Sequence, residues 1–378
     1  MRFLHISDLH LGKRVHEFSM LAEQSHILQV IVELAKENKV DAVLISGDIY
    51  DKTQPPAEAV ELFDSFLTEL FTADVAVLAI SGNHDAQERI SYGNKILSES
   101  NVHFSHTFDG SIKSIPFQDE YGTLWVHLLP FLKPLHVRRF FEGIQAGDYS
   151  GAIEAVLSNL DLKEADRHVL LAHQFVVAEG KNPERSESET QVGGLDSVKA
   201  SLFSSFDYVA LGHLHKAQEA GADYLRYSGS PLKYSLSEID HEKSAVLVEL
   251  KEKGNLKIEL LPLHAKHDLR YIEGFMDELL DPDFIKEQKT DDYLFVGIKD
   301  EQVVDAMAKL RGVYPNVMSL EFISQKTGGA SMSRSFDPQL MESPLQLFEQ
   351  LYFRQWDKEM SPESKELITK FIIGEEQK

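Results

Sequence analysis

Short apolar runs alternate with amphipathic segments over the first two-thirds of the chain. The apolar runs predict strands, and segments with apolar residues every three or four positions predict helices. Predicted strands cover residues 2–7, 41–46, 75–81, 124–129, 168–172, 208–211, 245–250 and 256–261. Predicted helices cover residues 18–38, 58–71 and 88–98. Buried strands with crossover helices favour an α/β fold that continues to about residue 263.

The pattern changes after this region. Residues 268–323 predict a small α+β unit, with strands over 271–275, 293–298 and 317–323 and a helix over 302–311. Residues 324–338 are rich in Gly, Ser and basic residues, a composition typical of a linker. We therefore predict an α/β domain over 1–265, an α+β cap domain over 266–323, a linker over 324–338 and a two-helix segment over 339–378.

The two predicted C-terminal helices, over residues 344–356 and 362–373, are unusually apolar. Their apolar side chains outnumber what two short helices can bury against each other. We expect this segment to dock on a partner protein, and docking on the chain's own cap domain is the alternative.

Composition places the chain among ordinary globular proteins. Of its 378 residues, 43% are apolar and 26% are charged, close to the usual values of about 45–50% and about 25%. This mix excludes wholesale disorder, and no apolar stretch approaches the ~20 residues that a membrane span needs. The first residues become polar too soon for a signal peptide, so we expect a cytoplasmic protein.

The ionisable residues restrict the chemistry further. The chain has no cysteine, so a bound metal must be held by His, Asp, Glu or Asn side chains. The net charge of −23 indicates a solubilising acidic surface and argues against a broad basic face for nucleic acid. An enzyme of this charge that acts on phosphates needs metal ions or a basic partner.

Four predicted strands end alike, with metal-ligating residue types in the first turn after the apolar run. The motifs are Asp8-Leu9-His10, Gly47-Asp48, Gly82-Asn83-His84-Asp85 and Gly212-His213-Leu214-His215. Each motif alone is usually a turn or a surface feature. Loops beyond the carboxyl ends of parallel strands meet in one crevice, however, and glycine lets the backbone approach it closely. Together the motifs predict a metal site with mixed oxygen and nitrogen ligands, which suit Mn²⁺, Fe²⁺ or Zn²⁺.

The order of these motifs resembles the calcineurin-like metallophosphoesterases over residues 1–235. The resemblance implies a β-sandwich flanked by helices and adds His173, which follows a predicted strand, although Ala172 stands where the family often has glycine. It implies that one metal is held by Asp8, His10, Asp48 and His215, and the other by Asp48, Asn83, His173 and His213. Asp48 would bridge the two metals.

Residues 3–12, 47–51, 208–215 and 227–231 are more closely similar to the SbcD and Mre11 family of nuclease subunits. This similarity implies two-metal phosphodiester hydrolysis with two Mn²⁺, and Mg²⁺, Fe²⁺ or Zn²⁺ as alternatives. The implied activities are 3′ to 5′ exonuclease action on double strands and endonuclease action on single strands and hairpins. The implied partners are DNA ends and hairpins and an SbcC-type coiled-coil ATPase, in a complex for DNA repair, recombination and replication.

The resemblance also implies catalytic roles and a homodimer. His84 would protonate the leaving 3′ oxygen, held in place by Asp85 or Asp48. The helices over 58–71 and 88–98 would pair with a second copy, the first through Val60, Phe63, Phe66, Leu67 and Leu70. The alternative is that this apolar face only covers the sheet. Asp51, His16 and the loop over 179–194 have no assigned role.

Two other classes of function share these motifs. A stand-alone phosphoesterase for nucleotides or phosphoproteins has the same metal site but needs neither a cap domain nor an apolar tail. A non-catalytic scaffold of the same fold is expected to lose metal ligands, and none is missing from this sequence. The sequence therefore favours the nuclease.

Overall fold

The computed structural model describes residues 1–178, 183–186, 189, 196–323, 349, 352, 359–361, 364–365 and 368–369. The chain divides into two compact units. The first comprises Met1–Tyr271 and Asp291–Phe295, and the second comprises Ile272–Thr290 and Val296–Lys378. The predicted linker, almost all of the two-helix segment and most of the loop over 179–194 lie outside the described residues.

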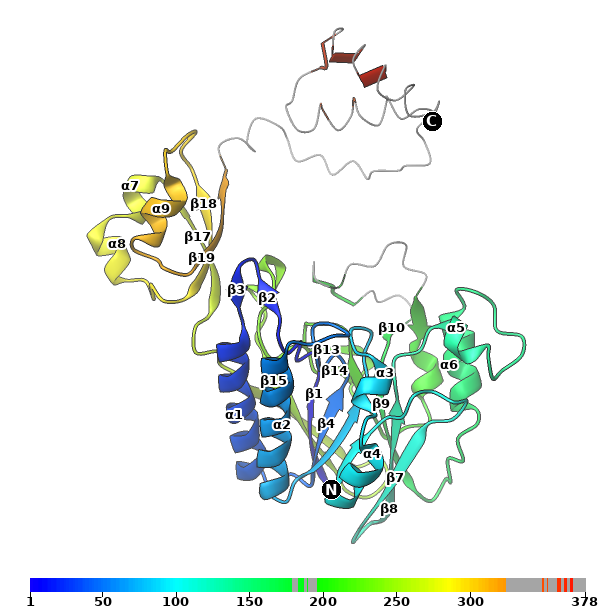
Figure 1. Cartoon of the computed structure of the whole chain (residues 1–378). Coiled ribbons are helices and arrows are strands. Elements are labelled where there is room, and N and C mark those ends of the chain that lie inside the picture. The colour runs from blue at the N-terminus through cyan, green and yellow to red at the C-terminus, as the bar shows by residue number, and fades with distance from the viewer. Residues whose placement is uncertain are drawn as a thin grey trace. The chain divides into compact units, whose positions relative to one another are not determined.

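The first sheet contains the N-terminal strand, in the order β16-β15-β1-β4-β5-β6 (Figure 1). Its strands are β1 (Arg2–Ile6), β4 (Ala42–Ser46), β5 (Ala76–Ile80), β6 (Val102–Phe104), β15 (Ser244–Leu250) and β16 (Leu256–Pro262). β1, β4, β5 and β6 run parallel to one another, so their carboxyl ends reach one edge of the sheet.

The second sheet has the order β13-β14-β12-β9-β8-β7. Its strands are β7 (Lys113–Asp119), β8 (Gly122–Leu129), β9 (Arg167–His173), β12 (Tyr208–Gly212), β13 (Gln218–Ala222) and β14 (Leu225–Tyr227). β8, β9, β12 and β14 are parallel. The sequence did not predict β7, because Pro116 argues against a central strand; the strand lies at the sheet edge, where proline is tolerated.

The two sheets pack face to face around an apolar core. Leu44 and Leu78 of the first sheet share one buried cluster with Val126, Leu171 and Ala210 of the second. Helices α1 (Leu21–Glu37) and α2 (Ala57–Thr72) lie side by side along the first sheet, whereas α5 (Pro134–Val137) and α6 (Tyr149–Leu157) lie at the second (Figure 1). The predicted fold class, a β-sandwich flanked by helices, is confirmed.

Apart from 3-10 turns, the remaining described elements of the first unit are short strands and α-helices. They are β2 (Arg14–Val15), β3 (Phe18–Ser19), α3 (Gln87–Ile90), α4 (Asn94–Leu97), β10 (Phe175–Val177) and β11 (Ser197–Lys199). The helix predicted over 18–38 begins at Leu21, because Phe18 pairs with Val15 in a hairpin. The helix predicted over 88–98 is wrong as one element, since Gly93 at φ 73° separates α3 from α4.

The apolar face predicted on α2 mostly covers the sheet. Phe63, Phe66 and Leu70 are buried, with 5%, 2% and 0% of their surface exposed. These three residues therefore belong to the core. The prediction that they form part of a dimer surface is wrong. Val60 remains exposed, at 44%.

A three-stranded sheet, β17-β18-β19, follows β16. Its region contains β17 (Leu269–Gly274), α7 (Met276–Leu279), α8 (Pro282–Lys286), β18 (Tyr293–Ile298), α9 (Ala306–Arg311) and β19 (Val317–Phe322). The helix predicted over 302–311 begins only at Ala306, because Asp305 has a left-handed conformation with φ 54°. None of the described helices has the length and apolar character that crossing a membrane requires.

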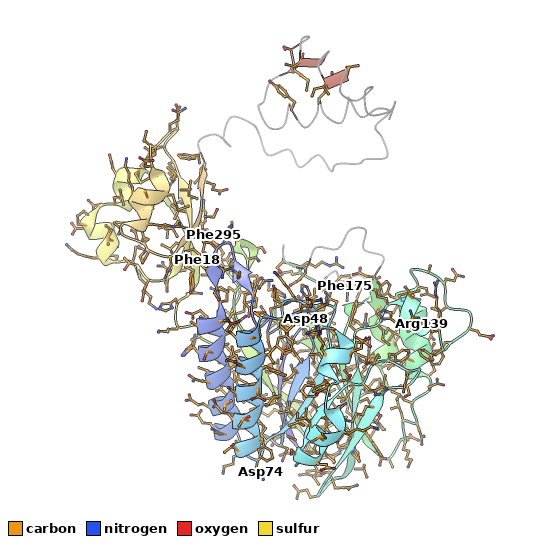
Figure 2. The ribbon with its side chains drawn as sticks, in the orientation of Figure 1. Phe18, Asp48, Asp74, Arg139, Phe175 and Phe295 are labelled. Atoms are coloured by element: carbon orange, nitrogen blue, oxygen red, sulfur yellow. The ribbon has the colours of Figure 1, made fainter. Side chains whose placement is uncertain are left out.

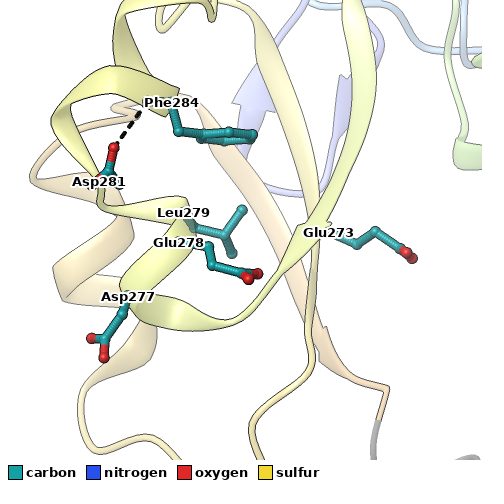
Figure 3. A pocket seen from close by; sticks show the side chains of 6 residues that line it. All are labelled: Glu273, Asp277, Glu278, Leu279, Asp281 and Phe284. Atoms are coloured by element: carbon teal, nitrogen blue, oxygen red, sulfur yellow. Dashed lines mark hydrogen bonds between the residues drawn. The ribbon is translucent and has the colours of Figure 1, made fainter.

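The second unit holds a pocket of ≈ 570 Å³ with several carboxylates in its lining (Figure 3). The lining residues are Glu273, Asp277, Glu278, Leu279, Asp281 and Phe284. Asp281 Oδ1 accepts the backbone amides of Asp283 and Phe284, and Glu278 Oε2 accepts that of Phe275. Both carboxylates cap short helices, which gives two of the four acidic lining residues a structural role.

Arg167 is a buried charge that joins the two sheets at the edge opposite the strand carboxyl ends. Its guanidinium donates to both carboxylate oxygens of Asp119, at 3.0 and 2.5 Å, and to the carbonyls of Gly122 and Lys251 at 2.8 and 2.6 Å. Only 1% of the residue's surface is exposed. Removing the cation would leave these two carbonyls without this donor, and Asp119 with the Met1 ammonium at 3.0 Å as its remaining cation partner.

We expect Arg167→Met to lower the free energy of unfolding by about 3–5 kcal/mol, because it breaks the ion pair of a buried guanidinium and leaves the carbonyls bonded to it without that donor. Urea denaturation of the full chain measures the change. Arg2→Met is the matched control, since the Arg2 side chain is 47% exposed and pairs with Glu249; it is expected to cost less than about 1 kcal/mol. Equal costs for the two variants would contradict the prediction.

Candidate metal centre

The predicted ligands come together where the strands of both sheets end. Figure 2 labels one of them, Asp48. Asp8 and His10 follow β1, Asp48 follows β4, Asn83 follows β5, His173 ends β9, and His213 and His215 follow β12. Two contacts join the sheets here: Ser46 Oγ donates to the Ala210 carbonyl at 2.8 Å, and the Ser46 carbonyl lies 2.7 Å from His173 Nδ1. Residues distant in sequence therefore share one rigid edge.

One group of donor atoms is centred on His10. Its Nε2 atom lies 3.1 Å from His215 Nε2 and 3.7 Å from Asp48 Oδ2. Asp8, His10 and His215 each offer a ligand atom, and these atoms all lie within 4.8 Å of one another. Two imidazole nitrogens and two carboxylates thus surround one point, which matches the first predicted ligand set.

The other group is centred on His173 and Asn83. His173 Nε2 lies 3.4 Å from Asp48 Oδ2 and 3.0 Å from Asn83 Oδ1, and Asn83 Oδ1 lies 3.1 Å from His213 Nδ1. Asp48 contributes to both groups, as a bridging carboxylate would.

Burial and charge make these groups fit divalent cations. Asp8 and Asp48 are 0% and 2% exposed, and neither forms an ion pair with Lys or Arg in the part of the chain that the structure describes. Buried carboxylates without a cation are costly, and burial raises the pKa of Asp8 above its usual range. Burial also lowers the pKa of His213 to about 3, which keeps its ring neutral and able to bind a metal.

Glycines before the ligands are required by close packing, as the sequence predicted. A Cβ atom on Gly82 would lie 2.1 Å from Asp48 Oδ1, and one on Gly212 would lie 1.9 Å from the Ser46 carbonyl oxygen. No side chain fits at either position. The backbone itself therefore forms part of the site's wall.

The ligand backbone is also strained. Asp8, His10, Asp48 and His213 have positive φ angles of 54°, 46°, 48° and 104°. Such conformations cost of order 1–3 kcal/mol each in non-glycine residues and cluster at functional sites. The fold thus holds these four side chains in place against local backbone preference.

His84 lies beside the ligands and is not enclosed by them. Its Nδ1 atom is 2.8 Å from the Asp51 carbonyl oxygen, and its Nε2 atom is 4.0 Å from Asp48 Oδ2. A carbonyl only accepts, so Nδ1 carries a proton and Nε2 is the atom that faces the site. The side chain is 36% exposed, which leaves it accessible to a substrate.

Asp85 has a different environment from the one expected. Its carboxylate accepts the backbone amides of Ile49, Tyr50 and Gly82 at 3.1, 3.0 and 2.9 Å. It therefore ties the loop after β4 to the loop after β5, whereas the His84 ring is held by the carbonyl of Asp51. The carboxylate of Asp51 pairs with Lys13 at 2.8 Å, and the His16 ring lies against Phe295 at 5.4 Å.

Sequence reasoning missed a buried ion pair behind His215. Glu238 Oε1 lies 3.1 Å from His215 Nδ1, and Lys243 Nζ donates to Glu238 Oε2 at 2.7 Å and to the His215 carbonyl at 3.0 Å. Glu238 and Lys243 are 0% and 8% exposed. A carboxylate behind an imidazole orients the ring toward a metal. The only local signal, the spacing of Ser235 and Glu238, is typical of a helix cap and points to another role.

We expect Glu238→Gln to weaken Mn²⁺ binding about 10- to 100-fold, because the support of a metal-binding histidine loses its charge. Calorimetric titration of the full chain measures the affinity. Glu259→Gln is the control, since the Glu259 side chain is 54% exposed on β16. Unchanged Mn²⁺ affinity in Glu238→Gln would show that the carboxylate has only a packing role.

Comparison with known proteins agrees with this geometry. The family model described as calcineurin-like phosphoesterase matches residues 1–217, which is more than half of the chain. The chain belongs to the calcineurin-like phosphoesterase family. The matched residues include every predicted ligand, from Asp8 to His215. The predictions of the family and of an enzyme that hydrolyses phosphoesters are confirmed, and the roles of the individual residues stay predictions.

Two curated relatives match well beyond the phosphoesterase region. The chain is 29% identical over 321 residues to the SbcD subunit of the nuclease SbcCD from Staphylococcus epidermidis, covering 85% of each chain. It is also 29% identical over 326 residues to the SbcD subunit of the same nuclease from Staphylococcus saprophyticus, covering 85% of this chain and 84% of the relative.

The solved structures that match are more distant. TT1561 of Thermus thermophilus is 15% identical with a TM-score of 0.41, covering 68% of this phosphoesterase and 98% of that chain. A dimetal phosphatase from Danio rerio is 12% identical with a TM-score of 0.42, covering 70% of this chain and 96% of that one.

Proposed function

We propose that this phosphoesterase is the nuclease subunit of an SbcCD-type complex that cleaves DNA phosphodiester bonds. The observation that carries the proposal is the extent of similarity to the two SbcD relatives, over 321 and 326 residues. Alignments of that length extend past residue 217, where the phosphoesterase match ends. A general phosphoesterase would have no reason to share the region beyond it.

The donor set supports a metal-dependent reaction with Mn²⁺ as the first candidate. Asp8, His10, Asp48 and His215 would hold one ion, and Asp48, Asn83, His173 and His213 the other. Bound divalent cations would supply charge neutralisation on a phosphodiester and an activated water. The chain's own residues set the ligand positions, through the strained backbone and the buried Glu238.

His84 is suited to proton donation in this proposal. Its Nδ1 is fixed by the Asp51 carbonyl at 2.8 Å, so Nε2 can be directed at a leaving oxygen. Its exposed edge leaves room for a substrate next to the buried ligands. A positioned imidazole of this kind contributes about 10²–10⁴-fold to hydrolysis.

The partners follow from the same relatives. Because those proteins are named as subunits of SbcCD, we propose a coiled-coil ATPase of the SbcC type as partner, bound through residues 339–378.

A homodimer would use the exposed Val60 and Phe71 of α2 with Tyr92 and Ile96 near α4, which are 44%, 56%, 85% and 76% exposed. Sedimentation that shows only monomer at tens of micromolar would argue against the dimer.

Cleavage of a hairpin DNA by the full chain with Mn²⁺, alone and with the ATPase subunit, tests the function. We expect cleavage that depends on Mn²⁺ and stops when the metal is chelated. A small phosphodiester and a set of nucleotides serve as comparison substrates. Hydrolysis of these small substrates without DNA cleavage, even with the ATPase subunit, would overturn the nuclease and favour a stand-alone phosphodiesterase.

A further inference from the structure

One segment of this acidic chain, which runs through the largely buried strand β8 into an exposed turn, lacks acidic residues. Residues 121–141 contain no Asp or Glu, although the chain carries 61 acidic residues against 38 basic ones. Lys133, Arg138 and Arg139 lie at the C-terminal end of this segment, and all three are exposed. We call residues 133–140 the basic turn; it contains the short helix α5.

Two hydrogen bonds connect Phe131 and Leu132, the residues immediately before the basic turn, to the loops of the metal centre. The Phe131 amide donates to the Ser81 carbonyl at 2.9 Å, immediately before Gly82 and Asn83. Gln174 Nε2, next to His173, donates to the Leu132 carbonyl at 3.2 Å. The Phe131 ring lies edge-on to the His173 ring at 6.2 Å. The turn therefore begins beside residues of the second ligand group.

Packing holds the basic turn in one orientation. Leu132 and Val137 are fully buried in the core outside the second sheet. The Phe140 ring packs edge-on against Phe108 at 5.5 Å. Because Leu132 and Val137 face inward, Lys133, Arg138 and Arg139 face solvent, and Figure 2 labels Arg139 on the side of the first unit that carries α5.

These three cations have no carboxylate partner in the part of the chain that the structure describes. Among the described residues, no carboxylate lies within ion-pair distance of Lys133, Arg138 or Arg139. The pKa of the His136 ring is lowered, first by burial and then by the nearby positive charges of Lys133 and Arg139. The negative charge of Glu88 acts in the opposite direction. Apolar surface adjoins the charges, since Leu135 and Phe140 are 49% and 48% exposed.

We propose that the basic turn binds the backbone of the DNA strand that runs past the metal centre, with the Phe140 ring offered to a base. The proposal rests on the proposed nuclease function. Unpaired cations next to an exposed aromatic ring are the combination that binds single-stranded nucleic acid. A strand held at the second ligand group must pass the adjacent surface, and Phe131 and Leu132, immediately before the basic turn, are hydrogen-bonded to residues beside that group's ligands.

The test compares Lys133→Gln/Arg138→Gln/Arg139→Gln with wild type in the Mn²⁺-loaded full chain. We expect KM for a single-stranded oligonucleotide to rise about tenfold or more, with kcat nearly unchanged, because the lost contacts are uniform binding contacts. The salt dependence of log KM should become shallower by roughly 2, since each phosphate contact on a single strand accounts for ~0.7. Hydrolysis of a small phosphodiester should not change, because it cannot reach the turn.

The control Lys36→Gln/Lys39→Gln/Lys251→Gln removes the same charge from exposed positions elsewhere. It should leave both KM and its salt dependence as in wild type. If the basic-turn variant also cleaves the oligonucleotide like wild type, the basic turn is not a DNA contact and the nuclease function stands. If wild type hydrolyses only the small diester, the proposed nuclease function is wrong, and so is the proposed DNA contact of the basic turn.

Discussion

Asp48→Asn is expected to remove metal from both groups of ligands at once. Asp48 Oδ2 lies 3.7 Å from His10 Nε2 and 3.4 Å from His173 Nε2, so its charge is shared between them. Loss of a supporting residue alone weakens metal affinity about 10- to 100-fold, and loss of a bridging ligand should exceed that range and lower hydrolysis by more than about 100-fold. Mn²⁺ stoichiometry by calorimetry, together with the rate of diester hydrolysis, measures both effects.

Thermal stability provides a second readout for Asp48→Asn. Metal that binds only the folded chain stabilises wild type by about 2.7 kcal/mol at a concentration 100 times Kd. Added Mn²⁺ should therefore raise the Tm of wild type and hardly change that of the variant. Asp74→Asn is the control, because Asp74 is exposed in the turn after α2. Figure 2 shows Asp74 at the end of the first sheet opposite to Asp48. Two Mn²⁺ bound with wild-type affinity in Asp48→Asn would refute the bridging role.

His84→Ala is expected to keep both metals and to lose cleavage of DNA by about 10²–10⁴-fold, the usual contribution of a general acid. The choice of leaving group sharpens the test. A 3′ alkoxide needs a proton to depart, whereas p-nitrophenolate does not. Hydrolysis of a p-nitrophenyl phosphodiester should therefore fall much less than cleavage of DNA.

The alternative for His84 is a metal ligand, because a ring nitrogen of His84, a ring nitrogen of His10 and a carboxylate oxygen of Asp48 all lie within 4.8 Å of one another. Loss of metal stoichiometry in His84→Ala, with equal loss of activity on both substrates, would establish that role instead. His106→Ala is the matched control, since the His106 side chain is 31% exposed and pairs with Asp109 outside the centre.

Local patterns in the sequence were sufficient for the strands of the sandwich and for the residues that end them. Consecutive apolar residues in β4 and β5 are buried on both faces, and such runs are recognisable without knowing their neighbours. Polar residues directly after such strands must lie at a sheet edge, so Asp48 and Asn83 were predictable candidates. The requirement for Gly82 and Gly212 followed from the same argument.

Only the tertiary structure decided which partners these residues meet. Glu238 and Lys243 reach His215 through folding of the chain after β14, and a cap-like spacing in the sequence cannot reveal a buried ion pair. The same applies to Phe63 and Phe66, whose helical spacing is equally compatible with a core or with a dimer surface. Periodicity shows that a helix face is apolar, but long-range packing decides which surface covers that face. Long-range packing also brings the Asp51 carbonyl to the His84 ring.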